Sequence, residues 1–514
     1  MTHAVGLPRG WAATELGQVR VDLSRALDPR QYPDEDFELY SVPSFADGEP
    51  EIVRGSAIGS TKMTLTPGTV VVCKINPRIN RVWVVGDRSP HKKIGSGEWI
   101  PFFPVEGVTP HFLAYYLQRD HFRNFLAARV SGVGGSLMRV RPTTLDEYPL
   151  PIPSVSEQQR IVEAIESYLT QLDNAGALLE RVEQNLKRYR ASVLKAAVEG
   201  RLVPTEAELA RREGRSYEPA SGLLKRILAE RKTRWIEDAA EKACARAEEK
   251  AHKAGQPWAA TDNAATLEKE RAKAAKQYKE PTAPDTTNLP ELPEGWYWAS
   301  IGVCFPVEIG ATPRRDVPEY WSGGISWVSS GEVAFCRIRT TRESISPEGL
   351  ANTSTHLNPA GTVLIGMIGE GRTRGQVAIL DTPACNNQNA AAIWVGATDC
   401  VPEYVYYYLM SQYEQTRRRG SGGNQPALNK ARVQAIPLPL PPADEQRRIA
   451  ERIEVLFEVA ELGDAEVRHA SGRGTRLRQS ILKWAFEGKL VDQDPNDEPA
   501  SLLLDRIRSE RAGR

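Results

Sequence analysis

The tripeptide Glu487-Gly488-Lys489 is the closest approach to a catalytic motif in this sequence. It resembles the end of a metal-dependent nuclease triad, in which acidic residues hold a divalent cation. No acidic partner is positioned upstream of it, and Glu199-Gly200-Arg201 stands in the same context at the end of an earlier predicted helix. Because glycine readily ends a helix, we interpret both tripeptides as helix stops.

Other catalytic motifs are missing from the sequence. A methyltransferase acting on adenine needs an Asn/Asp-Pro-Pro-aromatic turn, but Asn76-Pro77-Arg78 and Asn358-Pro359-Ala360 lack the second proline and the aromatic residue. The Gly-x-x-x-x-Gly-Lys-Ser/Thr loop that cradles phosphates is also absent. The seven histidines show no metal-ligand spacing. The sequence therefore predicts no catalytic residue and no metal site in this chain.

Basic and amide side chains gather in two separate stretches. Lys and Arg neutralise DNA phosphates, whereas Arg can pair with guanine, and Asn or Gln with adenine. Singly, each of these side chains is more simply a solvated charge; as sets, they favour DNA contact. The first set comprises Lys74, Asn76, Arg78, Arg81, Lys92, Lys93, Arg129, Arg139 and Arg141, the last three of which flank a loop at 131–136. The second comprises Arg314, Arg315, Arg372, Arg374, Arg417, Arg419, Asn424, Gln425 and Lys430, the last five of which flank a loop at 421–423.

The elements that must position these two sets are copies of one another. Leu7-Pro8-x-Gly10-Trp11 returns as Leu292-Pro293-x-Gly295-Trp296, and Glu157-Gln158 returns as Glu445-Gln446. Six such blocks recur in the same order, and the unit is far longer than a solenoid repeat, so a domain has been duplicated. The stretches between the blocks differ. Matching flanking blocks around divergent central stretches suit a protein that holds two different recognition elements in equivalent positions.

Each copy is predicted to combine short strands with one long helix. Strand patterns occur at 69–72, 81–85, 362–365 and 391–394. A short helix around Tyr115 or Tyr407 follows, and then a proline-rich, strand-like exit at 149–153 or 437–441. A long helix begins directly after each exit. In the first copy its cap is Ser154 or Ser156, with a capping-box glutamate or glutamine three positions on.

Both long helices carry apolar residues at heptad spacing, which indicates a coiled coil. The first seam is predicted to be Ile165, Tyr168, Leu172, Ala175, Leu179, Val182, Leu186, Tyr189, Val193 and Ala196. The second keeps Ile449, Ile453, Leu456, Leu477, Ile481 and Trp484, whereas Gly463, Gly472 and Gly474 predict a bend or looser packing in its middle. Two such helices in one chain most simply pair with each other, antiparallel.

The predicted fold is α+β: two mixed α/β domains separated by two long antiparallel coiled-coil helices, related by a pseudo-two-fold internal duplication. We expect five segments: a first domain at 1–153, a helix at 154–203, a charged helical insert at 204–284, a second domain at 285–441, and a second helix with a tail at 442–514. The Ala-rich, charged tract at 206–279 is either a solvated helical hairpin, in part disordered, or a docking surface for a partner.

The repeated blocks resemble the specificity subunits of type I restriction–modification systems. The resemblance rests on Leu292-Pro293-Glu294-Gly295-Trp296, on the run from Pro437 to Ile449, on the run from Ser480 to Val491, and on the tail from Asp494 to Ser501. It spans nearly the whole chain. The long charged insert departs from the family pattern and leaves the geometry of the spacer open.

The resemblance implies two target-recognition domains, each of which reads one half of a split, asymmetric site in double-stranded DNA. The helices would fix the gap between the halves and bind two modification (methyltransferase) subunits, with restriction (translocase and nuclease) subunits completing the assembly. S-adenosylmethionine, ATP and Mg²⁺ would then belong to the partner subunits, and this chain would hold no cofactor. An alternative is the specificity subunit of a methylation-only system that lacks a restriction partner.

Composition leaves two other hypotheses to test: an enzyme with an unrecognised site, and a coiled-coil scaffold with no role in DNA binding. The formal net charge is zero, which is unusual for a DNA-binding protein, although a basic face can be balanced by acidic helices elsewhere. No run of about 18 apolar residues and no signal-peptide pattern occurs, so we expect a cytoplasmic protein without a membrane partner.

Overall fold

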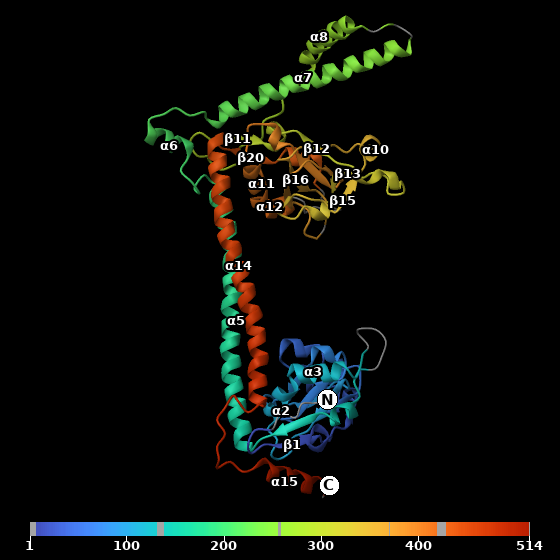
Figure 1. The fold of residues 1–514 in the computed structure, drawn as a ribbon, viewed down its shortest axis with the longest axis vertical. Helices are drawn as coiled ribbons and strands as arrows, with labels where there is room; N and C mark the ends of the chain where they lie inside the picture. The colour runs from blue at the N-terminus through green and yellow to red at the C-terminus, as the bar shows by residue number, and fades with distance from the viewer. Residues whose placement is uncertain are drawn as a thin grey trace. The chain divides into compact units, whose positions relative to one another are not determined.

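The computed structural model of the chain describes residues 7–130, 138–254, 257, 259–369, 371–418 and 428–512. The chain divides into two compact units, Met1–Glu183 with Glu466–Arg514, and Gln184–Ala465. Two helices of 44 residues, α5 (Val155–Val198) and α14 (Ala443–Phe486), contribute to both units (Figure 1). At about 1.5 Å per residue, each helix is about 66 Å long.

The first unit contains three sheets. The five-stranded sheet has the order β2 (Ala26–Leu27), β5 (Lys62–Thr64), β8 (Lys92–Gly95), β3 (Asp36–Tyr40) and β4 (Glu51–Arg54). The three-stranded sheet has the order β7 (Val82–Val84), β6 (Val70–Cys73) and β9 (Trp99–Phe102). In the third, β1 (Ala12–Glu15) pairs antiparallel with β10 (Pro149–Ile152). The helices of this domain are α1 (Leu16–Val19), α2 (Pro110–Leu117), α3 (Asp120–Ala127) and α4 (Pro142–Asp146).

The second unit repeats this plan with different details. Its five-stranded sheet has the order β12 (Val307–Ile309), β19 (Ala390–Ile393), β16 (Val363–Gly366), β17 (Val377–Leu380) and β14 (Cys336–Ile338). A three-stranded sheet has the order β15 (Glu343–Ile345), β13 (Trp321–Val328) and β18 (Cys385–Asn386), and β11 (Tyr297–Ser300) pairs with β20 (Pro437–Leu440). The helices are α9 (Ile301–Cys304), α10 (Pro347–Ala351), α11 (Pro402–Ser411), α12 (Tyr413–Arg418) and α13 (Lys430–Gln434). The four predicted strands, the two short helices and both proline-rich exits are confirmed.

The equivalent strands β6 and β16 are buried on both faces, which explains their unbroken apolar sequences. In β6, Val70 and Val72 pack into one core cluster while Val71 and Cys73 pack into another. In β16, Val363 and Ile365 face one cluster and Leu364 faces another. A strand held from both sides gives the loop that follows it a fixed starting point.

The start of α5 is fixed to the first domain by buried hydrogen bonds. Ser154 caps the helix, because its Oγ accepts from the Glu157 backbone N–H at 3.0 Å. The predicted capping box is incomplete, since the Glu157 carboxylate accepts from the Trp11 indole N–H at 2.9 Å. Gln158 accepts from the Thr109 N–H at 2.8 Å and donates to the Gly107 carbonyl at 2.9 Å. Trp11, Glu157 and Gln158, all from the repeated blocks, thus form one joint between the domain and the helix.

The start of α14 repeats this joint in the second unit. The Trp296 indole N–H donates to Glu445 at 2.8 Å, matching Trp11 and Glu157. Gln446 accepts from the Val401 N–H at 2.9 Å and donates to the Pro441 carbonyl at 2.9 Å, matching Gln158. The sequence blocks recur because the same helix-to-domain joint is built twice.

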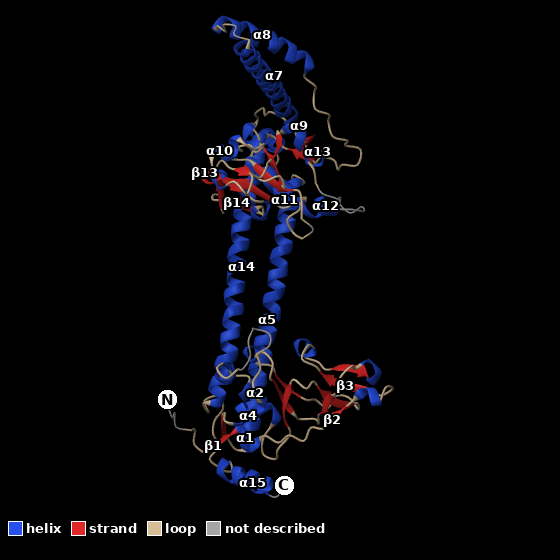
Figure 2. Cartoon of the chain, turned by 90° about the vertical axis from the view of Figure 1, so that its right-hand side faces the viewer, coloured by secondary structure: helices blue, strands red, loops and turns tan. Residues whose placement is uncertain are grey.

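The two long helices pack side by side and antiparallel in each unit (Figures 1 and 2). In the first unit, Asp173 of α5 pairs with Arg478 of α14, and the start of α5 shares a core with the end of α14. In the second unit, Arg190 lies 2.8 Å from Asp464, and Val193 shares a core with Ile449. The predicted pairing is confirmed.

The predicted seam of α5 is right at one heptad position and largely wrong at the other. Ile165, Leu172, Leu179, Leu186, Val193 and Ala196 are buried or half-buried as predicted, and so are the unpredicted Leu169, Gly176, Glu183, Arg190 and Ala197. Tyr168, Ala175, Val182 and Tyr189, which were expected in the seam, are exposed. On α14, Leu477 and Trp484 are likewise exposed rather than in the seam.

Helix α14 continues through the three glycines at which a bend or looser packing was expected. Gly463 lies directly against α5, and a Cβ atom there would stand only 3.2 Å from Leu186 Cδ1. Glycine at this position therefore permits a close approach of the two helices, which offsets its poor helix propensity.

The charged segment between the two copies forms helices α6 (Glu206–Glu213), α7 (Ala220–Lys253) and α8 (Ala260–Gln277). Figure 1 shows α8 packed back along the outer part of α7. In the first unit, the C-terminal helix α15 (Ala500–Ala512) matches the beginning of α7. Among the helices of the described ranges, none is both long enough and apolar enough to cross a membrane.

The second joint predicts a pH dependence of stability. Burial raises the pKa of Glu445, although hydrogen bonds from the Glu206 backbone and Trp296 act in the opposite direction. The folded state then holds this proton more tightly than the unfolded chain. The unfolding free energy should therefore fall as pH rises from the ordinary glutamate pKa through the raised one. Glu445→Gln can still accept from Trp296 and should lose this component.

Thermal unfolding midpoints between about pH 4 and pH 8, the range that spans ordinary and raised carboxyl pKa values, would measure the effect. The exposed Glu458 of the same helix provides the control substitution Glu458→Gln. A difference in unfolding midpoint between wild type and Glu445→Gln that stays constant across this pH range would contradict a contribution from the titration of Glu445.

Candidate nucleic-acid interface

The connection between β6 and β7 carries four of the nine residues of the first predicted set. It is a tight turn in which Asn76 and Asn80 have left-handed backbones, with φ of 47° and 51°, a conformation that asparagine tolerates. The Asn80 side-chain amide donates to the Leu117 carbonyl at 2.9 Å, which fixes the turn to the end of α2. Arg78 stands exposed on this turn.

Backbone pairing brings the distant residues Arg139 and Arg141 to the same turn. Ile75 and Arg139 form an antiparallel bridge, and the Val140 N–H donates to the Lys74 carbonyl at 3.0 Å. We call the group formed in this way the β6–β7 cluster: Lys74, Asn76, Arg78, Arg139 and Arg141.

An acidic residue that the sequence did not point to lies within the β6–β7 cluster. Glu98 is 3.8 Å from the Lys74 ammonium and 3.0 Å from the Arg139 guanidinium. It positions these two side chains and lowers their net positive charge. Within the described residues, the side chains of Arg78 and Arg141 are exposed and form neither ion pairs nor hydrogen bonds, so they are the cations most available to a ligand.

The remaining members of the first set lie apart from the cluster or are engaged elsewhere. Lys92 and Lys93 belong to β8 in the other sheet. Lys92 pairs with Glu35 at 2.7 Å. Arg129 lies just after α3 and stacks on Phe125 at 3.9 Å. Arg81 precedes β7, and its backbone carbonyl accepts from the Cys73 N–H at 3.0 Å.

Lys93 does not fit the prediction of an accessible DNA-binding residue. It is 8% exposed, and its ammonium lies 3.4 Å from the buried carboxylate of Glu38. Burial raises the pKa of Glu38, but hydrogen bonds from Ser89 and Tyr40 and the charge of Lys93 outweigh this and lower it below the ordinary value. Lys93 is therefore a structural counterion.

In the second unit the corresponding connection, between β16 and β17, carries part of the second set. The Gly366 N–H donates to the Gln376 carbonyl at 2.8 Å, which closes a glycine-rich hairpin. The Tyr413 hydroxyl donates to the Arg372 carbonyl at 2.7 Å, and Arg417 donates to the Tyr413 hydroxyl at 3.3 Å. The three arginines that gather here, Arg372, Arg374 and Arg417, form the β16–β17 cluster.

The two clusters occupy equivalent places in the duplicated frame. Each lies on the loop that follows the doubly buried strand, β6 or β16. Each loop is tied to the segment before a short helix, through the Val140 N–H in the first unit and through the Leu428 N–H to the Met367 carbonyl, at 3.1 Å, in the second. The residues themselves differ between the clusters, so the frames are the same while the chemistry of the loops is not.

The other residues of the second set do not join the β16–β17 cluster. Arg314 pairs with Asp316 at 2.6 Å, and Lys430 pairs with Glu308 at 3.0 Å. Arg315 stacks on Trp321 at 3.8 Å. It also donates two hydrogen bonds to the Glu343 carboxylate, which lowers the pKa of that group. Arg419, Asn424 and Gln425 lie outside the described residues.

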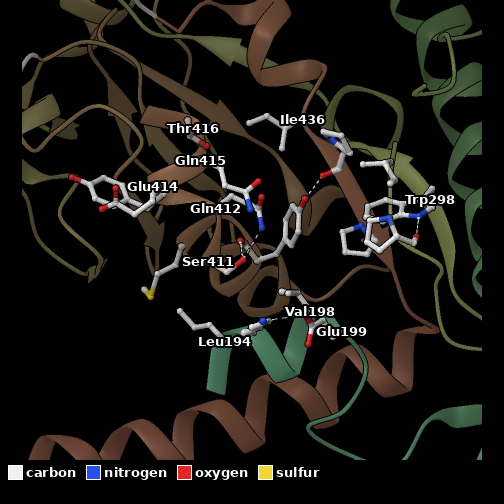
Figure 3. A pocket seen from close by; sticks show the side chains of 18 of the residues that line it. Leu194, Val198, Glu199, Trp298, Ser411, Gln412, Glu414, Gln415, Thr416 and Ile436 are labelled. Atoms are coloured by element: carbon white, nitrogen blue, oxygen red, sulfur yellow. Dashed lines mark hydrogen bonds and ion pairs between the residues drawn. The ribbon is translucent and has the colours of Figure 1, made fainter. Parts of the chain in front are cut away.

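A pocket of about 860 Å³ opens in the second unit. Figure 3 shows Leu194 and Val198 of α5, with Glu199 just after it, on one side and Ser411 to Thr416 of the α11–α12 junction on the other, with Trp298 beside them. The Trp298 indole N–H donates to the Pro290 carbonyl at 3.0 Å. No residue of either predicted set lines the pocket, but Tyr413, which contacts Arg372 and Arg417, does, so the pocket adjoins the β16–β17 cluster.

Sequence reasoning missed the roles of the Trp–Glu pairs and of the two glutamines. Their recurrence in both copies was visible, but their partners are backbone groups or lie about 150 positions away, at 146 and 149 residues' separation. The recurrence of a tryptophan and a glutamate in the same order in both copies was the signal that could have identified the helix-to-domain joint.

The sequence matches the family described as "Type I restriction modification DNA specificity domain" over residues 29–184 and again over 293–464. The EcoDI specificity subunit of Escherichia coli is 21% identical over 425 residues, which covers 79% of this chain and 77% of that protein.

Two solved structures share the fold. One, from work on complex assembly and conformational transition of the type I R-M system, has a TM-score of 0.65 at 18% identity and covers 94% of this chain and 99% of its own. The HsdS subunit of Thermoanaerobacter tengcongensis has a TM-score of 0.52 at 18% identity, with 95% and 99% covered. The chain therefore belongs to the type I restriction–modification DNA specificity family, whose domain it carries twice.

Proposed function

We propose that this chain reads a bipartite, asymmetric DNA site and holds the catalytic subunits of a type I restriction–modification complex without performing chemistry itself. The observation that carries this proposal is the pair of clusters at equivalent places in the duplicated frame. Equivalent positions give each domain the same kind of contact with DNA, and different side chains give each a different base preference. A single reader would need only one such loop.

Exposed apolar side chains on the long helices support the binding of two modification subunits. The first unit exposes Tyr168, Leu178, Val182, Leu477 and Trp484, with Trp484 51% exposed. The second exposes Tyr189, Val455, Val459 and Leu462, with Leu462 65% exposed. Large apolar groups that remain in water mark protein interfaces. Each unit carries one such set, so each unit would bind one methyltransferase subunit. Restriction subunits would then bind to this core assembly.

The absence of catalytic motifs fits the same assignment. S-adenosylmethionine, ATP and Mg²⁺ would be supplied by the partner subunits, and the role of this chain would be to position DNA and partners. Its place of action would be the cytoplasm, where the DNA lies.

Exchange of one recognition domain tests the proposal. Residues 1–153 would be replaced by the matching segment of another member of the family, and the hybrid would be purified with its modification subunits. Sequencing of methylated positions should show that one half of the target has changed while the other half and the gap persist. The reciprocal exchange of residues 285–441 is the matched control and should change only the other half.

Two results would defeat the modular assignment: a change in both halves after a single exchange, or no change in either. Methylation or cleavage of DNA by the isolated chain, given metal ion and methyl donor, would show instead that it is an enzyme.

A further inference from the structure

The hairpin of α7 and α8 is fixed at its base to the second domain. The first turns of α7 contribute Leu223, Leu224 and Ile227 to the core of this unit. Arg226 pairs with Glu218 at 2.9 Å, and Arg234 donates to the Ala397 carbonyl at 3.3 Å. The base of α7 therefore cannot pivot freely on the domain.

The outer part of the hairpin is held together by its own contacts. Ala240, Cys244 and Ala274 are buried between the two helices. Arg271 of α8 lies 2.8 Å from Glu237 of α7, and the rings of Trp235 and Tyr278 meet edge to face at 5.5 Å. These contacts make the hairpin a stable projection with fixed faces.

Charges are segregated around α7. At about 100° per residue, six exposed cations fall within about 100° of arc; they are Lys225, Lys232, Lys242, Arg246, Lys250 and Lys253. The exposed Arg226 and Arg234 lie outside this arc and are engaged at the base of the helix. The acidic residues occupy the neighbouring arc; they are Glu230, Glu237, Asp238, Glu241, Glu248 and Glu249. We call the first group the α7 basic stripe.

Most cations of the α7 basic stripe have no anionic partner in the described part of the chain. Lys225, Lys242, Arg246 and Lys250 form no ion pair there, whereas Lys253 pairs with Glu249 at 2.6 Å. The stripe extends over about 42 Å, from the rise per residue of a helix. DNA presents one phosphate charge per about 1.7 Å of its axis, so a stripe of this length can neutralise several phosphates.

The surface favours a nucleic-acid backbone over a protein partner. Protein interfaces are built around buried aromatic and aliphatic anchors. On the described part of the hairpin, Trp235 is the only large apolar side chain that is exposed, and it is engaged by Tyr278. Between the cations lie small residues such as Ala239 and Ala243. Long, mobile cationic side chains without an apolar centre suit a sequence-independent contact with phosphates.

We infer that the α7 basic stripe is a second DNA-binding surface, which contacts the phosphate backbone of double-stranded DNA without reading its sequence. This inference rests on the proposed function, because it assigns a further contact to the same ligand. The stripe adds affinity for DNA and makes that affinity more dependent on salt, and it leaves the choice of target to the recognition domains.

Salt titration of DNA binding by the full-length chain tests the inference. The stripe variant combines Lys242→Gln, Arg246→Gln, Lys250→Gln and Lys253→Gln. The matched control neutralises the acidic arc of the same helix with Glu230→Gln, Asp238→Asn, Glu241→Gln and Glu248→Gln. Fluorescence anisotropy with a mixed-sequence duplex of about 40 base pairs would give the dissociation constant at several salt concentrations. Far-UV circular dichroism would confirm that both variants keep their helices.

The plot of log affinity against log salt should lose about 2 to 4 units of slope in the stripe variant, and affinity at low salt should fall at least tenfold. The control should keep the wild-type slope. An unchanged slope in the stripe variant overturns the inference, and loss of methyltransferase-subunit binding together with an unchanged slope would replace it with a protein contact. Equal loss in both variants overturns it too. Failure of the wild-type chain to bind any duplex would instead defeat the proposed function.

Discussion

Replacing Arg78 and Arg141 with glutamine should weaken binding of the chain to its target duplex by one to three orders of magnitude. Both side chains are exposed on the β6–β7 cluster, and neither has an ion-pair partner among the described residues. Loss of an arginine that pairs with guanine costs about 1–3 kcal/mol and relaxes specificity at that base. Loss of a phosphate contact lowers affinity for all sequences and reduces the salt slope by about 1 unit.

The measurement should therefore separate the two roles. Dissociation constants would be compared for the target duplex, for duplexes altered in each half of the target, and at two salt concentrations. The control variant, Lys195→Gln with Lys483→Gln, removes the same charge from exposed residues in the last turns of α5 and α14. If this control weakens binding as much as the cluster variant, the β6–β7 cluster has no special role.

Replacing Trp296 with alanine should destabilise the second unit by about 3–5 kcal/mol, the usual cost of truncating a large buried aromatic side chain. Trp296 is buried, packs edge to face on Tyr404 at 6.5 Å, and donates to Glu445. Its removal leaves a cavity and also deprives the buried Glu445 carboxylate of one of its two hydrogen-bond donors, the other being the Glu206 N–H. Thermal unfolding should show a markedly lower midpoint for the transition of this unit.

Two further variants separate packing from hydrogen bonding. Trp296→Phe keeps most of the apolar contact but loses the N–H, so it should cost about 1–3 kcal/mol, the range for an unsatisfied buried polar group. Tyr297→Ala changes the exposed neighbour and should leave stability nearly unchanged. A midpoint for Trp296→Ala within the error of wild type would show that the joint does not stabilise the unit.

The sequence was sufficient to predict the duplicated frame and the pairing of the long helices, because both depend on patterns that repeat. It could not fix the phase of the coiled-coil seam. The α5 sequence is apolar at two neighbouring heptad positions, and periodicity alone does not tell which stripe faces α14. Leu172 and Leu179 belong to the seam, whereas Tyr168 and Val182 are exposed. The extra stripe fits the proposed binding of a modification subunit, which a single sequence does not reveal.

The candidate site was predictable as a set of residue types but not as a set of neighbours. Lys93 was grouped with accessible cations because its partner, Glu38, lies on a distant strand; the parallel pairing of β3 and β8 sets the two residues opposite each other. In the same way, a single antiparallel bridge between Ile75 and Arg139 brings Arg139 next to Lys74. Strand register decides which charges are neutralised, and register between distant strands is not written in local sequence.

The glutamines at the starts of α5 and α14 hold their domains mainly through main-chain atoms, although Gln446 also contacts the Cys400 thiol. Gln158 engages Thr109 and Gly107, and Gln446 engages Val401 and Pro441, all through backbone N–H or carbonyl groups. A main-chain atom is present whatever side chain the residue carries. The recognition domains can therefore mutate or recombine extensively during evolution while the docking of each rod persists, provided that the tryptophan and the path of the chain are kept. New target specificities can arise in this architecture without rebuilding the scaffold.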